Sequence, residues 1–82
     1  MSDWIKSPAD TMIYRREKIS GVRIYKHIYK NYDKAYKVEV LADGDWRSYY
    51  EGSVFSTNDE EYIAEERAKA WGIYRKLCAE LE

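Results

Sequence analysis

Residues 57–82 read TNDEEYIAEERAKAWGIYRKLCAELE and form the longest stretch of the chain with a single period. When residues are placed about 100° apart, as on an α-helix, one narrow stripe is apolar. Its members are Ile63, Ala70, Tyr74, Leu77 and Leu81, with Trp71 and Cys78 on one flank and Ile73 on the other. Charged residues point away from the stripe, among them Glu65 and Lys69. The pattern predicts one long helix with a buried face and an exposed face.

The start of this helix carries a recognisable signal. Thr57 is suited to be the N-cap, and Glu60 three residues later completes a capping box. Asp59, Glu60 and Glu61 place negative charge in the first turn, where free backbone N–H groups favour it. Gly72 falls in mid-helix on the exposed side, where glycine costs about 1 kcal/mol relative to alanine. Two interpretations are open, sequence drift and close approach of a neighbour, and drift is favoured.

The residues before the helix read as strands and turns. Three strands are expected, over residues 22–32, 35–42 and 46–55. Asn31-Tyr32-Asp33-Lys34 supplies one turn, and Asp43-Gly44-Asp45 is the strongest hairpin signal in the chain. Gly52 is expected at a bulge or bend in the third strand. The inner face of the sheet is expected to carry Val22, Ile24, Ile28, Tyr36, Val38 and Val40.

Together these elements predict an α+β fold, an antiparallel three-stranded meander with one long C-terminal helix packed on one face. A fourth strand is an open alternative. The whole chain, 1–82, is expected to form a single domain, with an N-terminal segment 1–20, a sheet 21–56 and a helix 57–82. Residues 1–20 fit either a short helix starting at Ser7-Pro8 or an irregular or extended segment, and the irregular or extended segment is favoured. Trp4 and Ile5 are expected to anchor this segment to the core.

Composition bounds the functional classes. The 82 residues contain 3 Trp, 9 Tyr and 1 Phe, which together give 13 aromatic side chains for a small core. One cysteine allows no internal disulfide, which fits a reducing compartment. No apolar run is long enough for a membrane span and no signal peptide is visible, so a cytoplasmic protein is expected. The net charge is −1, from +4 in residues 1–42 and −5 in residues 43–82.

No set of residues suggests catalysis, and the protein is expected not to be an enzyme. His27 has no cysteine at metal-ligand spacing, so neither a metal nor a cofactor is expected. Cys78 is interpreted as a small packed apolar residue, with a reactive thiol as the alternative. The four glycines are scattered and form no phosphate-binding loop.

The second face of the predicted sheet is a candidate binding surface. It is expected to show Arg23, Tyr25, His27, Tyr29, Lys37, Glu39, Leu41, Arg47, Tyr49 and Glu51. Tyrosine and arginine are favoured at recognition surfaces because they combine large contact area with hydrogen bonding. The alternative is that tyrosine is present as a good strand former. The 9 tyrosines favour binding.

Residues 21–81 resemble a family of DNA-binding domains. Gly21-Val22-Arg23, the third strand ending in Glu51-Gly52-Ser53-Val54-Phe55 and the alanine-bearing helix are similar to the sheet-plus-helix domains of ethylene-response factors and integrase arm-binding domains. The resemblance implies that the exposed sheet lies in the major groove of duplex DNA. It implies base or backbone contacts from Arg23, Tyr25, Lys37, Arg47 and Tyr49. Glu39 and Glu51 on the same face, and a net charge of −1, depart from that pattern.

By size, tyrosine content and acidic C-terminal half, the chain is also similar to small phage counter-defence proteins such as anti-CRISPR proteins. The expected function is therefore occlusion of a host protein complex, with duplex DNA as the alternative partner, and neither a membrane nor a small-molecule substrate. The partner-binding residues are expected to be Arg23, Tyr25, Tyr29, Lys37, Arg47 and Tyr49 on the sheet. Asp59, Glu60 and Glu61 at the helix start are the other candidates, as a phosphate-like decoy for a basic channel.

Overall fold

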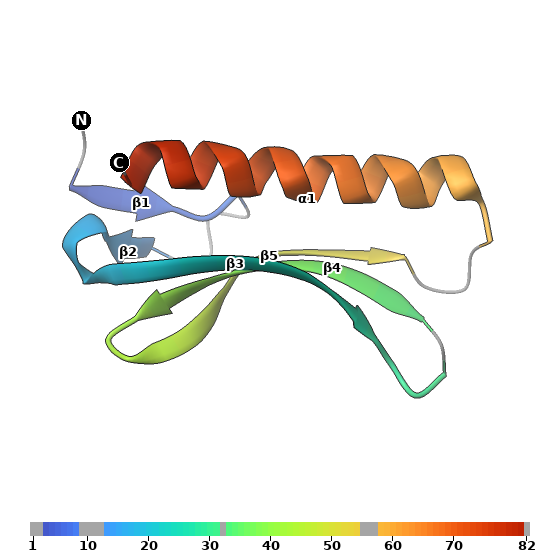
Figure 1. Cartoon of the computed structure of the whole chain (residues 1–82), viewed down its shortest axis with the longest axis horizontal. Coiled ribbons are helices and arrows are strands. Elements are labelled where there is room, and N and C mark those ends of the chain that lie inside the picture. Colours follow the sequence, from blue (N-terminus) through green and yellow to red (C-terminus); the bar gives the residue numbers. More distant parts are fainter. Residues whose placement is uncertain (1–2, 9–12, 32, 55–57, 82) are drawn as a thin grey trace.

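The computed structural model describes residues 3–8, 13–31, 33–54 and 58–81. The elements are β1 (Trp4–Lys6), β2 (Ile13–Arg15), the short 3₁₀ helix η1 (Arg16–Lys18), β3 (Ile19–Ile28), β4 (Lys34–Ala42), β5 (Asp45–Val54) and α1 (Glu60–Leu81). Strands β3, β4 and β5 form an antiparallel sheet in that order, and β1 and β2 form a separate two-stranded sheet. The predicted α+β meander with a C-terminal helix is therefore confirmed (Figure 1).

Helix α1 lies along one face of the three-stranded sheet (Figure 1). Its predicted apolar stripe supplies the contact: Ala70 and Leu77 are buried, and Ile63, Tyr74 and Leu81 pack against the same core. From the sheet, Val38 and Val40 are fully buried beneath the helix. Complete burial of a side chain of this size contributes about 1.5–3 kcal/mol. The core therefore lies between α1 and the three-stranded sheet, and Ile5 of β1 and Tyr14 of β2 also belong to it.

The helix begins at Glu60, and Asp59 is its N-cap. The Asp59 Oδ1 atom accepts hydrogen bonds from the backbone N–H groups of Glu61 at 3.0 Å and Tyr62 at 3.3 Å. The first helical bond runs from the Ile63 N–H to the Asp59 carbonyl at 3.0 Å. The predicted N-cap, Thr57, lies two residues before the observed cap and outside the described residues. An aspartate cap prevails because its carboxylate reaches two free donors and adds favourable negative charge.

Both predicted turns occur. Asp43 and Gly44 have positive φ angles of 53° and 84°, which is the mirror-image type I turn that joins two strands through two residues. At the other hairpin, the Asn31 side chain accepts a hydrogen bond from the Asp33 N–H at 3.2 Å. The strands lie within a few residues of their expected limits, and β3 begins earlier and ends earlier than expected.

The N-terminal segment is extended where it is described. Strands β1 and β2 pair antiparallel, with Ile5 opposite Tyr14. Ile5 is buried in the core, whereas Trp4 is 54% exposed and stacks under the Arg15 guanidinium at 5.3 Å. The expected anchor is therefore Ile5, and the prediction for Trp4 was wrong. The helical alternative was also wrong for residues 13–15, because alternating burial of Ile5 and Tyr14 fits two short strands.

A bulge in β5 lies at Tyr49, and Gly52 has a different role. Val38 pairs with Tyr50, but the next residue, Glu39, pairs with Ser48, so Tyr49 is the extra residue. Gly52 pairs regularly with Tyr36 instead of forming the expected bulge or bend. A Cβ atom on Gly52 would lie 2.7 Å from Glu66 Oε2 and 3.0 Å from Tyr50 Oη. A side chain at this position would displace the Glu66 carboxylate or the Tyr50 ring, so the close approach of these two side chains favours glycine.

Three further expectations, for Ile28, Gly72 and Cys78, can be compared with the structure. Ile28, expected on the inner face, is 54% exposed because it is the last residue of β3, where the sheet bends away from α1 (Figure 1). A Cβ atom on Gly72 would meet no other atom within 4 Å, which favours drift over close approach within the described chain. Cys78 is partly buried, as expected for the rim of the helix stripe.

Candidate interaction surface

The sheet face opposite α1 carries no covering element among the described residues, and we call it the open face (Figure 1). It follows from strand alternation, because Val22 and Ile24 pack towards α1 and the residues between them point the other way. The open face comprises Arg23, Tyr25, His27, Tyr29, Lys37, Glu39, Leu41, Trp46 and Glu51. The sheet arches so that both hairpin turns bend away from α1 (Figure 1). The open face is thus the concave side of the sheet.

Arg23 is the most constrained side chain of the open face. Its Nε donates a hydrogen bond to Glu39 Oε1 at 2.7 Å, and its second guanidinium nitrogen lies 2.6 Å from the same oxygen. The guanidinium carbon lies 4.1 Å from the centre of the Trp46 ring and 5.3 Å from that of Tyr25. A guanidinium stacked on aromatic rings and bonded to a carboxylate loses little further freedom on binding.

A second cluster surrounds Tyr29 at the other end of the open face. The Tyr29 hydroxyl donates a hydrogen bond to Glu51 Oε1 at 3.0 Å, and the Lys37 Nζ atom lies 5.9 Å from the Tyr29 ring centre. His27 meets the same ring edge-on, with centroids 4.5 Å apart. The hydrogen bond to Glu51 raises the pKa of the Tyr29 phenol above its ordinary value. Tyr29 is therefore held protonated beside a carboxylate.

Two of the predicted surface residues are not on the open face. Tyr49 is only 8% exposed, and its hydroxyl donates to the Lys6 carbonyl at 3.0 Å. Arg47 pairs with Val40, a residue of the helix side, so its side chain starts from the other face of the sheet. Both corrections have one cause: the bulge at Tyr49 exchanges the two faces in the first half of β5.

The same bulge brings Trp46 onto the open face, and sequence reasoning missed this residue. Trp46 pairs with Leu41, is 40% exposed and lies against Arg23. A signal was present in the sequence. A two-residue turn at Asp43-Gly44 fixes Ala42 opposite Asp45 and hence Leu41 opposite Trp46. Leu41 was expected on the open face, so its partner belonged there too.

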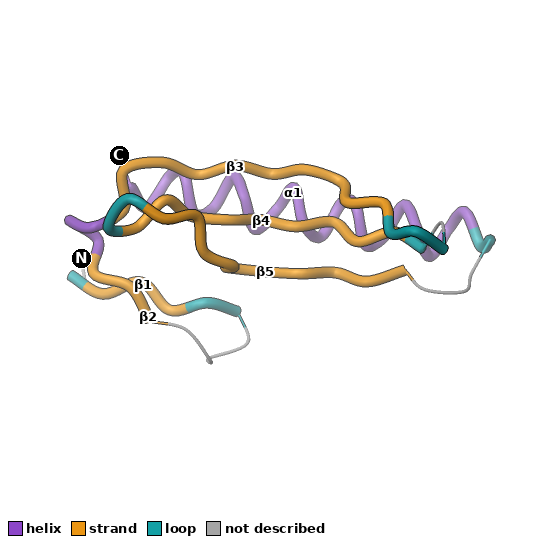
Figure 2. The backbone as a smooth tube through the Cα atoms, turned by 90° about the horizontal axis from the view of Figure 1, so that it is seen from below, coloured by secondary structure: helices purple, strands orange, loops and turns teal. Residues whose placement is uncertain are grey.

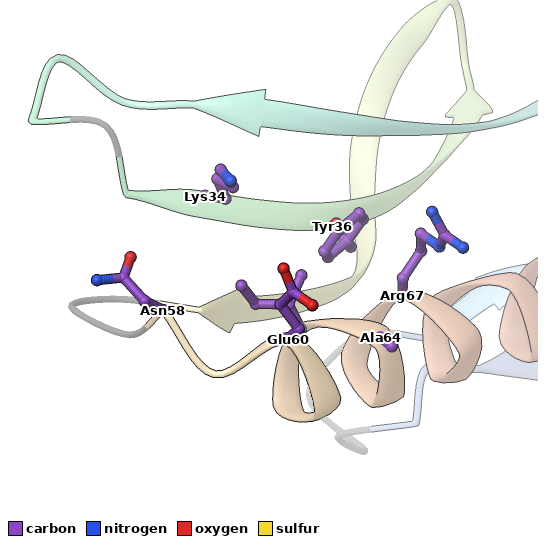
Figure 3. A pocket seen from close by; sticks show the side chains of 7 residues that line it. Lys34, Tyr36, Asn58, Glu60, Ala64 and Arg67 are labelled. Atoms are coloured by element: carbon purple, nitrogen blue, oxygen red, sulfur yellow. The ribbon is translucent and has the colours of Figure 1, made fainter.

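The acidic helix start does not join the open face. Asp59 is engaged as the N-cap, and α1 lies on the opposite side of the sheet (Figure 1). Glu60 lines a hollow at the helix start together with Lys34, Tyr36 and Arg67 (Figure 3). The structure therefore separates the two predicted binding regions by the thickness of the sheet, and a partner on the open face does not touch Asp59, Glu60 or Glu61.

The open face is electrically balanced. Arg23 and Lys37 contribute +2, and Glu39 and Glu51 contribute −2, so the sum is 0 with His27 neutral. Each acidic residue is engaged with the aromatic or cationic side chains described above. A balanced surface gives no net attraction for phosphate groups, which dominate affinity for nucleic acids. Its aromatic and arginine content remains that of a protein-binding surface.

Comparison with models of known protein families, with curated proteins and with solved structures found no match. Within residues 3–8, 13–31, 33–54 and 58–81, three or more His, Cys, Asp or Glu side chains nowhere gather as ligands for a metal ion. In the same ranges, the one long helix lacks the apolar length that a bilayer span needs.

Proposed function

We propose that the protein is a non-enzymatic binding protein that docks the open face of its sheet onto a protein partner. The arrangement of Arg23 between Trp46, Tyr25 and Glu39 supports this function most directly. Tryptophan, tyrosine and arginine are the residues that contribute most binding energy at protein interfaces, above all when they cluster near the centre. Arg23 packs against two such aromatic side chains on the β3 edge of the open face.

Duplex DNA is the weaker candidate for this surface. Its expected contacts included Arg47 and Tyr49, which lie elsewhere, and the cations that remain are matched by Glu39 and Glu51. DNA binding would require several unpaired cations facing the phosphates. The narrower expectation of a phage-type inhibitor of a host complex, anti-CRISPR-like in action, stays a prediction.

The test is affinity capture from the source cell with the native chain, two open-face variants and one control variant, followed by mass spectrometry. We expect the native chain to retain a partner that Arg23→Ala and Trp46→Ala lose. A matched control is Lys69→Ala, on the exposed side of α1. The proposal fails if all variants retain the same partner. A mobility shift with duplex DNA at low salt, lost in Arg23→Ala, would favour DNA instead.

A further inference from the structure

The two edges of the sheet differ. The N-terminal strands β1 and β2 lie beside β5, whereas β3 forms the opposite edge with β4 as its only strand neighbour in the described chain (Figure 2). Free strand edges present unpaired backbone groups that accept another strand. The β3 edge is 10 residues long, which is ample for such pairing.

The backbone groups that point outward from β3 can be assigned. The Tyr29 N–H donates to the Asp33 carbonyl at 2.9 Å, so this pair is hydrogen-bonded, and such pairs alternate along an antiparallel ladder. The register of β3 on β4 is unbroken from Gly21 opposite Leu41 to Ile28 opposite Lys34. The residues whose N–H and C=O groups face away from β4 are therefore Val22, Ile24, Lys26 and Ile28.

A basic and aromatic groove runs beside this edge, between β3 and the flank of α1. One hollow of about 260 Å³ is lined by Ile24, Lys26, Tyr36, Arg67 and Trp71 among others. Two further hollows share lining residues with it: one along α1 shares Arg67 and Trp71 and reaches Arg75. The other shares Tyr36 and Arg67 and reaches Lys34 (Figure 3), and we call the three together the groove. Trp71 is 41% exposed in the groove, with the Arg75 guanidinium 5.7 Å from its ring centre.

The charge of the groove favours an anionic occupant. Lys26, Lys34, Arg67 and Arg75 line it, and Glu60 is its only acidic lining residue among those described. In the described part of the chain these four cations form no ion pair. They contrast with Arg23 on the open face, which is neutralised by Glu39.

We infer that this groove binds an extended acidic polypeptide segment of a partner, which adds to the sheet as a fourth strand along β3. Backbone hydrogen bonds would come from Val22, Ile24, Lys26 and Ile28, and acidic side chains on alternate residues would face Arg67 and Arg75. A nucleic acid satisfies the charge but not the row of backbone donors and acceptors. A second copy is disfavoured because β3 carries Arg23 and Lys26 and no acidic residue.

The test uses a fluorescein-labelled peptide of about eight residues that alternates glutamate and threonine, followed by fluorescence anisotropy. We expect Arg67→Glu combined with Arg75→Glu to weaken binding about tenfold or more. The matched control is Lys69→Glu combined with Lys76→Glu, which makes the same charge change on the exposed side of α1 and should alter affinity less than about twofold. N-methylation of alternate peptide amides should abolish binding.

Backbone pairing has its own readout in amide hydrogen exchange. Bound peptide should slow amide exchange at Val22, Ile24, Lys26 and Ile28. The open-face variant Trp46→Ala should bind the peptide with the same affinity as the native chain. The inference is overturned if the peptide does not bind, if both double variants lose affinity equally, or if N-methylation has no effect. Tighter binding of oligothymidylate would indicate a nucleic acid, and a dimer in sedimentation that pairs through β3 would indicate a second copy. Affinity capture with the Arg23→Ala variant tests the open face independently of the groove beside β3.

Discussion

The Tyr14 hydroxyl donates a hydrogen bond of 2.7 Å to the backbone carbonyl of Ser48, 34 residues further along the chain. This bond joins β2 to β5 beside the bulge, and the Tyr49 hydroxyl makes the reciprocal connection to Lys6 in β1. Both tyrosine rings are buried in the same core cluster. These two long-range hydrogen bonds and the apolar body of Ile5 thus help to hold the N-terminal strands to the sheet.

We predict that Tyr14→Phe and Tyr49→Phe each lower the free energy of unfolding by about 1 kcal/mol, because each removes one hydrogen bond but keeps the ring. The two effects should not be strictly additive, since both bonds hold the same pair of strands. Urea unfolding followed by far-ultraviolet circular dichroism measures the change. Tyr62→Phe is the control, because Tyr62 is exposed. Unchanged stability in the double variant would contradict this role for the N-terminal strands.

The buried tyrosines also predict alkaline destabilisation. Burial is the main cause that raises the pKa of Tyr14, Tyr49 and Tyr50 above the ordinary value, and the carboxylate of Glu66 adds to the effect at Tyr50. The folded state then holds these protons more tightly than the unfolded state. Their contribution to stability is complete below a pH of about 10 and is lost as the pH rises through the folded pKa values.

We therefore expect the free energy of unfolding to fall above a pH of about 10. Replacing Tyr50 by phenylalanine should make this decline shallower, because one titrating group is removed. Unfolding curves at a series of pH values, with tyrosinate absorbance near 295 nm as a second readout, measure the effect. A decline of equal slope in Tyr50→Phe and the native chain would contradict the assignment.

The two glycines Gly52 and Gly72 predict opposite outcomes for the same substitution. Gly52→Ala places a methyl group against Glu66 and Tyr50, which donates to Glu66 Oε2 at 3.3 Å. Relief of the clash moves the Glu66 carboxylate and breaks that bond, so stability should fall by about 1 kcal/mol. Gly72→Ala meets open space and should raise stability by up to about 1 kcal/mol.

Thermal unfolding of the two alanine variants side by side measures this contrast. If the two variants shift the unfolding temperature equally and in the same direction, the close approach at Gly52 is not the reason for glycine there. Because Gly72 lies on the exposed side of α1, its alanine variant is also a suitable stabilised background for the binding experiments.

The N-cap of α1 predicts a distinct pattern of substitutions. Asp59→Ala should cost about 1 kcal/mol, because two backbone donors lose their acceptor. Asp59→Asn should retain most of that stability, since the amide oxygen can accept the same bonds. Asn58→Ala is the neighbouring control. Chemical unfolding distinguishes the variants, and a larger loss from Asn58→Ala than from Asp59→Ala would refute the cap.

The parts of the fold that sequence predicts well are those set by local interactions. The stripe through Ala70 and Leu77 has a period that only a helix satisfies, and Asp43-Gly44 suits a turn with positive φ angles. The bulge at Tyr49 depends on tertiary contact. Tyr49 and Tyr50 are adjacent aromatic residues, and each can serve either face until Lys6 and Glu66 provide their partners.

The candidate surface follows the same division. Arg23, Tyr25 and Lys37 alternate where β3 and β4 pair in unbroken register, so their shared face could be predicted from period alone. Tyr29 directly follows the last residue of β3 and continues the same alternation. Arg47 lies beyond the bulge, where strict alternation gives the wrong face. The groove beside β3 was not foreseen, because it joins the flank of α1 to a strand edge, and the choice of sheet edge is not encoded in either element alone.

Charge balance on the open face predicts a gain of function. Replacing both Glu39 and Glu51 by glutamine keeps side-chain shape and hydrogen-bond acceptors but leaves Arg23 and Lys37 uncompensated, which changes the face from 0 to +2. The native chain should not shift duplex DNA at about 50 mM salt, whereas this double variant should bind it weakly. Two phosphate contacts imply a loss of about tenfold in affinity between about 50 and 200 mM salt. The control, Glu61→Gln with Glu65→Gln, changes net charge equally, from −1 to +1, on the exposed side of α1. Equal DNA binding by both variants would show that overall charge, and not the balance on the open face, excludes DNA from the native protein.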